Sequence, residues 1–167
     1  MQINASSIAL VSGKLRLIMP VKLPRVPGFD VAGDVVEIGP DVTGFATGDR
    51  VHARIATNNG TGACAEFALV GVDVLAKVSS GMNASEAAGL PLAGITALQG
   101  LRDQAGLPLE GARERVLVVG ASGGVGHIAI QIARAAGATV IGVCSTRNVE
   151  LVSSLGAHEV IDYTRPN

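Results

Sequence analysis

The sequence predicts a small β unit followed by an α/β unit with a parallel sheet. Up to about residue 80, short Val-rich runs alternate with Gly, Pro and Asp, as in antiparallel strands joined by turns. From residue 115 onward, strand-like and helical runs alternate, which is the order of a parallel sheet with crossover helices. The 22 glycines and 2% of aromatic residues agree with many tight turns and a core of small aliphatic side chains.

The first part of the chain is predicted to hold strands over 34–42, 48–53, 65–70 and 74–78. Helical character begins at Asn83, which stands three residues before Glu86, as in a capping box. Pro91 is expected to end or kink this helix, because proline lacks the N–H that a helix interior needs. We therefore expect two domains, 1–83 and 84–167.

The second part alternates strand and helix, with expected elements over 116–119, 125–136, 140–143, 149–155 and 160–161. The apolar run 116–119 is typical of a parallel strand that is buried on both faces. Gly137 and Gly156 are placed to end the two helices. Three strands with two crossovers make one half of a doubly wound dinucleotide-binding sheet, the Rossmann fold, so we expect a fragment of a longer protein.

The turn between the first of these strands and its helix carries the functional prediction. Gly120, Gly123 and Gly126 stand at three-residue intervals, in register with the strand and the helix. In a dinucleotide-binding turn, the first glycine permits a sharp bend and the second lets backbone N–H groups approach a pyrophosphate. The third allows close helix–strand packing. The alternative is a glycine-rich connection that binds nothing; a P-loop is excluded because no Gly-Lys-Ser/Thr follows.

The end of the next strand indicates which dinucleotide binds. NAD sites usually place an acid about 20 residues after the glycine turn, where it binds the ribose 2′-OH. Residues 138–149 contain no acid and offer Ser145, Thr146 and Arg147, which are donors suited to a 2′-phosphate. The sequence therefore predicts NADP(H) as the cofactor. The alternative is that these three residues only cap and solvate the next helix.

Composition excludes several other classes of function. A net charge of -1 and few aromatic residues argue against nucleic-acid binding. Cys64 and Cys144 form no CxxC pair, and the three histidines are scattered, so we predict no metal site and expect both cysteines to be reduced thiols. His127, just after the glycine turn, is expected to be structural. Without a secretory signal or a long apolar stretch, the protein is expected to be soluble and cytoplasmic.

Several segments together resemble one family; they span 27–39 (PGFDVAGDVVEIG), 48–51, 65–70, 90–101, 120–137 and 154–163. By these motifs the chain resembles the medium-chain dehydrogenase/reductase superfamily. The resemblance is to its zinc-free quinone oxidoreductase branch, with zeta-crystallin, and particularly to plant chloroplast-envelope quinone oxidoreductase homologues. It implies a GroES-like substrate domain, incomplete at its N-terminus, followed by the first half of a Rossmann domain, with the active site in the cleft between them.

The resemblance also implies roles for single residues. Thr96 would lie near the nicotinamide end of the cofactor, and Arg147 and Tyr163 would flank the 2′-phosphate. The pyrophosphate would be held by the turn residues Gly120, Ser122, Gly123, Gly124, Val125 and Gly126. The alternatives are that Thr96 is an ordinary helix residue and Tyr163 a surface aromatic at a strand end.

Two positions depart from related proteins. Zinc-dependent relatives have Gly-His-Glu where this chain has Gly28, Phe29 and Asp30, so a carbonyl would be polarised by hydrogen-bond donors, and no catalytic residue is assigned. Over residues 9–12 the chain lacks the Asn-Pro-x-Asp segment of the family, and with it an Asn that borders the substrate pocket.

The resulting hypothesis is an NADPH-dependent reductase that transfers hydride to a small-molecule quinone or α,β-unsaturated carbonyl compound. Two alternatives stay open: a non-catalytic NADPH-binding module, motivated by the altered segment at 9–12, and an enoyl-reductase module of a larger synthase. The resemblance further implies a homodimer of the full-length protein, built on a Rossmann edge outside this chain.

Overall fold

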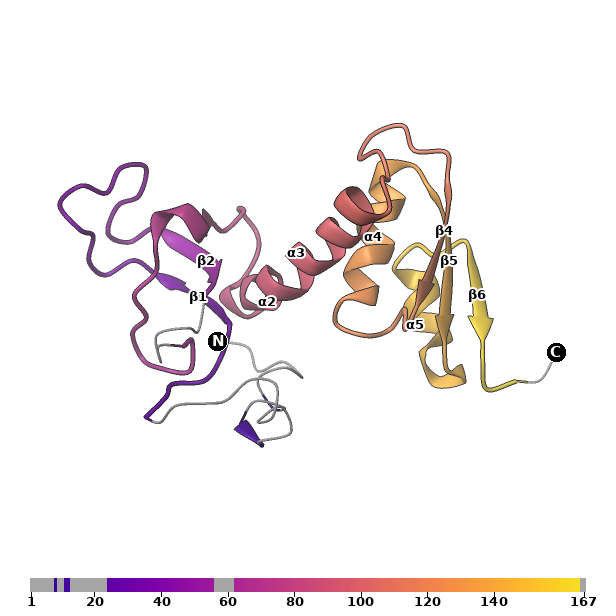
Figure 1. Cartoon of the computed structure of the whole chain (residues 1–167), viewed down its shortest axis with the longest axis horizontal. Coiled ribbons are helices and arrows are strands. Elements are labelled where there is room, and N and C mark those ends of the chain that lie inside the picture. The colour runs from indigo at the N-terminus through magenta and orange to yellow at the C-terminus, as the bar shows by residue number, and fades with distance from the viewer. Residues whose placement is uncertain (1–7, 9–10, 13–23, 56–61, 166–167) are drawn as a thin grey trace. The chain divides into compact units, whose positions relative to one another are not determined.

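The computed structural model describes Ile8, Val11, Ser12 and the ranges 24–55 and 62–165. The chain forms two compact units, Met1–Leu92 and Ala93–Asn167, and Figure 1 labels most of their helices and strands. The domain boundary predicted between residues 83 and 84 lies at the start of α2 (Ala84–Gly89) and stays a prediction. Of the altered segment at 9–12, residues 9 and 10 lie outside the described part.

The first unit is built on an antiparallel sheet of three strands. The strand order is β1 (Asp30–Asp34), β2 (Arg50–Arg54) and β3 (Leu75–Lys77), with a 3-10 turn over Val72–Val74 before β3. On β2 the buried positions are Val51 and Ala53, which alternate with exposed or half-buried neighbours as expected for a sheet with one covered face.

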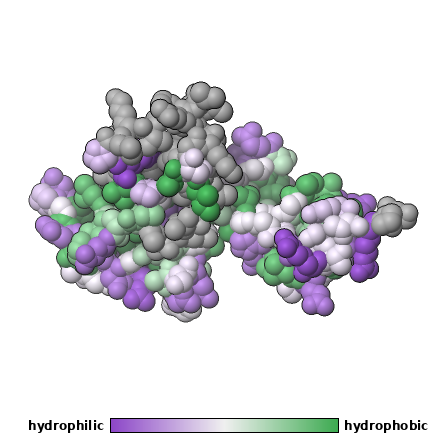
Figure 2. All heavy atoms as spheres, turned by 90° about the horizontal axis from the view of Figure 1, so that it is seen from below, coloured by the Kyte–Doolittle hydropathy of each residue, from purple (hydrophilic) through white to green (hydrophobic). Residues whose placement is uncertain are grey.

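Two of the predicted strands in this unit are confirmed and two are wrong. The segments 48–53 and 74–78 hold β2 and β3. Of 34–42 only Asp34 belongs to a strand, and 65–70 contains none. The apolar alternation in 65–70 does not form a strand because no described segment pairs with it, and Leu69 is 92% exposed. Figure 2 shows exposed hydrophobic residues, in green, beside hydrophilic ones, in purple, on the described part of the surface.

The predicted helix start and helix break are both confirmed. Asn83 caps α2: its Oδ1 accepts from the Glu86 N–H at 3.0 Å, and the Asn83 N–H donates to Glu86 Oε2 at 3.0 Å. The helix ends at Gly89, and α3 (Pro91–Gln99) begins at Pro91, where the missing N–H costs nothing. A π-helical turn over Gly100–Gln104 follows.

The second unit has the predicted order of strand and helix. From Arg115 onward it contains β4 (Arg115–Val119), α4 (Gly126–Ala136), β5 (Thr139–Cys144), α5 (Val149–Ser154) and β6 (Glu159–Asp162). The three strands are parallel in the order β4-β5-β6. Gly137 ends α4 with a φ of 102°, the left-handed conformation that glycine adopts without strain.

This parallel sheet is covered on one face only by the described residues. Val140 on β5 is fully buried, and α4 and α5 pack on that side (Figure 1). On β4, however, Leu117 is 57% and Val119 76% exposed, so the prediction that this strand is buried on both faces is wrong. Right-handed crossovers that run the same way across a sheet place both helices on one face. No described helix in the chain is of a length and apolarity that would let it cross a membrane.

Candidate functional site

The glycine turn lies where β4 ends and α4 begins, at the carboxyl end of the parallel sheet. Gly120 has a φ of +72°, which lets the chain leave the strand abruptly. The Ala121 N–H donates to the Val143 carbonyl at 3.0 Å, and this bond fastens the turn to β5. In open α/β sheets, ligands bind at this carboxyl edge. The turn predicted from the glycine spacing is therefore placed where a dinucleotide can reach it.

The third glycine closes the turn against the helix. A Cβ on Gly126 would overlap the Gly120 carbonyl oxygen and would lie 2.9 Å from Ala121 Cα. Both neighbours are backbone atoms, which cannot move aside as a flexible side chain can. The close approach of helix and strand that this glycine spacing predicts is thus present in the structure.

The turn leaves backbone N–H groups without protein acceptors. Among the described residues, the N–H groups of Ser122, Gly124, Val125 and Gly126 have no acceptor. The Gly123 N–H, in contrast, is taken by the Gly120 carbonyl at 2.9 Å. Free N–H groups at a helix N-terminus, together with the positive end of the helix dipole, form an anion site. These four donors fit the pyrophosphate of a dinucleotide.

A side chain that the sequence analysis missed connects this turn with the end of β5. Asn148 Nδ2 lies 2.9 Å from Ser122 Oγ and 3.3 Å from Ser145 Oγ. All three side chains are half-buried. The structure therefore brings together the predicted pyrophosphate residue Ser122 and the predicted 2′-phosphate residue Ser145.

Thr146 is engaged differently from Ser145. Its hydroxyl donates to Asp162 Oδ2 at 2.6 Å, and the Thr164 hydroxyl donates to Asp162 Oδ1 at 2.6 Å. The hydrogen bond from Thr146, and then that from Thr164, lowers the pKa of the Asp162 carboxyl. Asp162 is therefore a carboxylate whose two oxygens both accept from threonine hydroxyls.

The other predicted cofactor residues lie on separate elements. Arg147 is exposed in the 3-10 turn that follows β5. Tyr163 follows β6, with its N–H bonded to the Cys144 carbonyl at 3.2 Å and its side chain exposed. Both thus lie at the same sheet edge as Ser145. Thr96 is an exposed residue on α3, and its role stays a prediction.

His127 lies at the start of α4 and Cys144 at the end of β5, and neither side chain is fully exposed. His127 Nδ1 lies 2.9 Å from the Gly123 carbonyl, so this nitrogen carries the proton and the ring is tied to the turn. Burial, and next the charge of Asp162, raises the pKa of the Cys144 thiol. A buried thiol with a raised pKa is a poor nucleophile at neutral pH.

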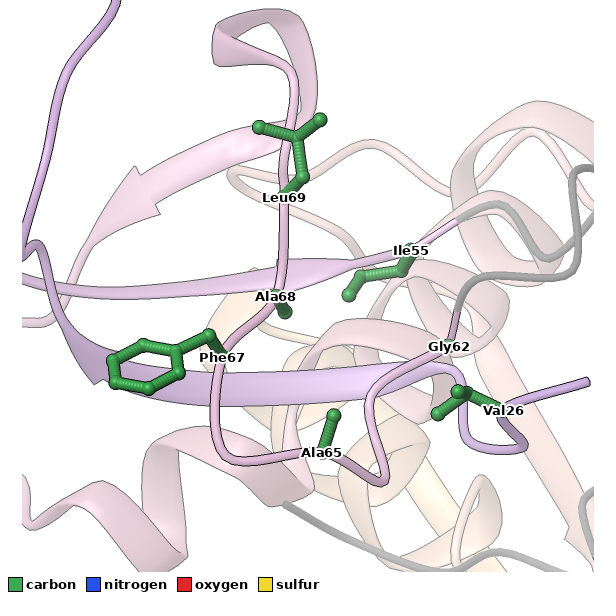
Figure 3. A pocket seen from close by; sticks show the side chains of 7 residues that line it. All are labelled: Val26, Ile55, Gly62, Ala65, Phe67, Ala68 and Leu69. Carbon is green, nitrogen blue, oxygen red and sulfur yellow. The ribbon is translucent and has the colours of Figure 1, made fainter.

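The first unit contains an apolar depression that the sequence analysis did not predict (Figure 3). Its lining side chains are all uncharged and mostly aliphatic: Val26, Ile55, Gly62, Ala65, Phe67, Ala68 and Leu69. Such a lining binds apolar surface but supplies no acid, base or metal ligand. Four of the lining residues belong to the segment 65–70, whose alternating apolar residues predicted a strand.

Comparison with known protein families agrees with this architecture. Residues 1–92 match the alcohol dehydrogenase GroES-like domain, and residues 124–167 match the zinc-binding dehydrogenase model. The chain belongs to the medium-chain dehydrogenase/reductase superfamily. Its two units correspond to a GroES-like domain followed by the start of a Rossmann domain, as the sequence predicted.

Individual members of the superfamily align along nearly the whole chain. The chain is 45% identical to the chloroplast envelope quinone oxidoreductase homolog of Arabidopsis thaliana, over 98% of the chain and 50% of that protein. An alcohol dehydrogenase superfamily protein from Novosphingobium aromaticivorans matches with a TM-score of 0.87 and 36% identity, covering 98% of this chain and 48% of the other. Mycobacterial Rv1454c, solved in complex with NADPH, matches with a TM-score of 0.79 and 32% identity, covering 96% and 47%. The chain thus spans about half the length of the relatives it matches.

The residues present do not fit the zinc site of the zinc-dependent members. At the positions where the resemblance places Gly-His-Glu in zinc-dependent relatives, Phe29 offers no ligand, and the buried Asp30 carboxylate accepts from the Leu92 N–H at 2.7 Å. No group of three or more His, Cys, Asp or Glu side chains within the described ranges is arranged to hold a metal ion.

Proposed function

We propose that this protein is an NADPH-dependent oxidoreductase that reduces a quinone or an α,β-unsaturated carbonyl compound without zinc. The observation that supports it most directly is the glycine turn at the carboxyl edge of the sheet, whose N–H groups have no acceptor among the described residues. Membership of a superfamily of oxidoreductases supports the class of reaction, and the quinone oxidoreductase name of the Arabidopsis relative supports the class of substrate.

The preference for NADPH over NADH rests on the end of β5. No acid follows Cys144 before Glu150, so nothing in this stretch is placed to bind a ribose 2′-OH as in NAD sites. Asp162, at the end of β6, already accepts from two threonine hydroxyls. Arg147 and Ser145 offer a charged and a neutral donor for a 2′-phosphate. The relative solved with NADPH supports the same preference.

The reaction follows from the electronic structure shared by the two substrate classes. NADPH, when bound, would supply a hydride, and quinones and enones both accept hydride at a carbon conjugated with a carbonyl. The charge then develops on the carbonyl oxygen, where hydrogen-bond donors stabilise it before a proton arrives from solvent. The described residues of this chain contribute cofactor binding and orientation to this scheme.

A fluorescence titration with NADPH, with NADH as control, tests the cofactor site. We expect saturable binding that is tighter for NADPH, because only NADPH carries the 2′-phosphate. Equal affinity for both cofactors would contradict the assignment of Ser145 and Arg147. Absence of binding by the folded chain would contradict the cofactor site as a whole.

A turnover assay separates the reductase from the non-catalytic NADPH-binding module. NADPH oxidation is followed by absorbance with a panel of quinones and enones as acceptors. We expect oxidation that depends on one of these acceptors and saturates with it. NADPH binding without acceptor-dependent oxidation would favour the binding module. An enoyl-reductase module of a synthase would reduce α,β-unsaturated thioesters in preference to free quinones.

A further inference from the structure

Asn148 lies between the two serines that the proposed site uses for different parts of the cofactor. Ser122 belongs to the glycine turn after β4, and Ser145 follows β5. Asn148 Nδ2 reaches Ser122 Oγ at 2.9 Å and Ser145 Oγ at 3.3 Å. The amide nitrogen carries two hydrogens, so it can donate to both hydroxyl oxygens at the same time.

The direction of these hydrogen bonds decides what the serines can do. A serine hydroxyl has one proton to donate and lone pairs with which to accept. Because Asn148 donates to both oxygens, neither serine needs its own proton for this contact. Within the part of the chain that the structure describes, neither the Ser122 nor the Ser145 hydroxyl proton has an acceptor. Both protons therefore remain available to an incoming anion.

Thr146, the neighbouring hydroxyl, is in the opposite state. Its proton goes to the Asp162 carboxylate at 2.6 Å. A phosphate in contact with Thr146 would therefore compete with a carboxylate for one proton, and would also meet the charge of Asp162. Within residues 145–148 the fold thus gives three polar side chains different states: the Ser145 hydroxyl proton is available, the Thr146 proton is used by Asp162, and the Asn148 amide donates to Ser145.

We propose that Asn148 is a positioning residue for the cofactor: it holds the Ser122 and Ser145 hydroxyls as donors to the pyrophosphate and the 2′-phosphate, respectively. This role rests on the proposed function, because it assumes that a dinucleotide occupies this sheet edge. The Asn148 amide thereby links the end of β5 to the glycine turn, so its loss should weaken both phosphate contacts.

A double-mutant cycle on cofactor affinity tests this role. Asn148→Ala is expected to weaken NADPH binding about fivefold to tenfold, the usual effect of losing aligned hydrogen bonds. NADH binding is expected to weaken less, because only the Ser122 contact applies to it. In the Ser122→Ala/Ser145→Ala background, Asn148→Ala should have no further effect on either cofactor. Ser154→Ala removes an exposed α5 hydroxyl bonded to the Leu151 carbonyl and serves as the matched control.

The outcomes distinguish the positioning role from a structural one. If Asn148→Ala weakens binding equally in both backgrounds, or weakens NADH as much as NADPH, Asn148 acts through general stability and the proposal is overturned. If the alanine variant unfolds, the near-isosteric Asn148→Asp replaces it. Its carboxylate can only accept, so it takes both serine protons, and NADPH binding should fall; unchanged NADPH affinity overturns the proposal.

The wild-type titration separates this proposal from the proposed function. If the wild-type protein binds neither NADPH nor NADH, the proposed function fails and the role of Asn148 fails with it. If the wild-type protein binds NADPH and Asn148→Ala binds it equally well, only the positioning role is overturned.

Discussion

At the scale of single residues, the candidate site depends on groups that the fold leaves unpaired. The turn after β4 offers N–H groups that have no acceptor among the described residues, since no helical carbonyl precedes them. Its glycines let a ligand approach these groups without side chains in between. Ser122 and Ser145 add hydroxyl protons that Asn148 leaves free. A neighbouring hydroxyl, that of Thr146, is instead used inside the protein by Asp162. Cofactor affinity should therefore respond to some polar residues at this edge and not to others.

Replacing Gly126 by alanine tests the close contact within the turn. The added Cβ would overlap the Gly120 carbonyl oxygen, so backbone must shift, and we expect a loss of unfolding free energy of about 1–3 kcal/mol. Gly124→Ala is the matched control, because a Cβ there meets nothing within 4 Å. Urea unfolding of both variants measures the difference; similar stability of the two variants would contradict the packing argument.

Asp162 gives a prediction about pH. Its pKa is lowered by the hydroxyls of Thr146 and Thr164, so the stabilisation is complete above the ordinary Asp pKa and is lost as the pH falls through the lowered one. Asp162→Asn removes this contribution. The variant should be less stable than wild type at pH 7, and the gap should shrink below about pH 4. Thermal unfolding at several pH values measures it, and a gap that stays constant with pH would contradict it.

At the scale of elements, the helices begin with caps of two kinds. Asn83 and Glu86 cap α2 within four consecutive residues, and the sequence pattern predicted this. The first turn of α3 is instead capped by a residue of β1. The Asp30 carboxylate accepts a hydrogen bond from the Leu92 N–H, 62 residues later in the sequence. A carboxylate at a helix N-terminus also interacts favourably with the helix dipole.

Removing the Asp30 carboxylate should destabilise the first unit. Hydrogen bonds to charged groups contribute about 1.5–3 kcal/mol, so Asp30→Ala is expected to lower the unfolding free energy by about 2 kcal/mol. Asp30→Asn keeps an acceptor for the Leu92 N–H and should lose less. Chemical denaturation compares the two; equal losses would indicate that the carboxylate charge, and not the hydrogen bond, is what matters.

At the scale of the whole molecule, each unit has its own core, and the parallel sheet of the second unit is buried on one side. Val140 has no exposed surface, whereas Val119 on the neighbouring strand is 76% exposed. The same residue type in the same sheet therefore differs in the packing it provides. Replacing each of these two valines by alanine therefore compares how much the covered and the exposed face of the sheet contribute to the free energy of unfolding.

Val140→Ala should cost about 2 kcal/mol, from lost burial and the cavity left behind. Val119→Ala should stay within about 0.5 kcal/mol of wild type, as exposed substitutions usually do. Urea unfolding followed by circular dichroism measures both. A large loss for Val119→Ala would show that a second layer covers β4 in solution.

The sequence alone determined the features that depend on neighbouring residues. The order of the parallel unit, the capping box at Asn83 and the glycine turn follow from periodicity and from local backbone requirements, and the structure contains all three. The missing acid after β5 is likewise a local observation. These features can be predicted from the sequence because each depends only on a few neighbouring residues and not on what packs around them.

Only the tertiary structure decided which polar groups meet and which surfaces are covered. The Asn148–Ser122 contact joins residues 26 apart in sequence, and the Thr146–Asp162 contact joins residues 16 apart. The apolar alternation of 65–70 predicted a strand, yet without a pairing partner among the described residues it lines an apolar depression instead. A strand, a buried face and a directed hydroxyl each need a partner from elsewhere in the chain, and no local pattern states where that partner lies.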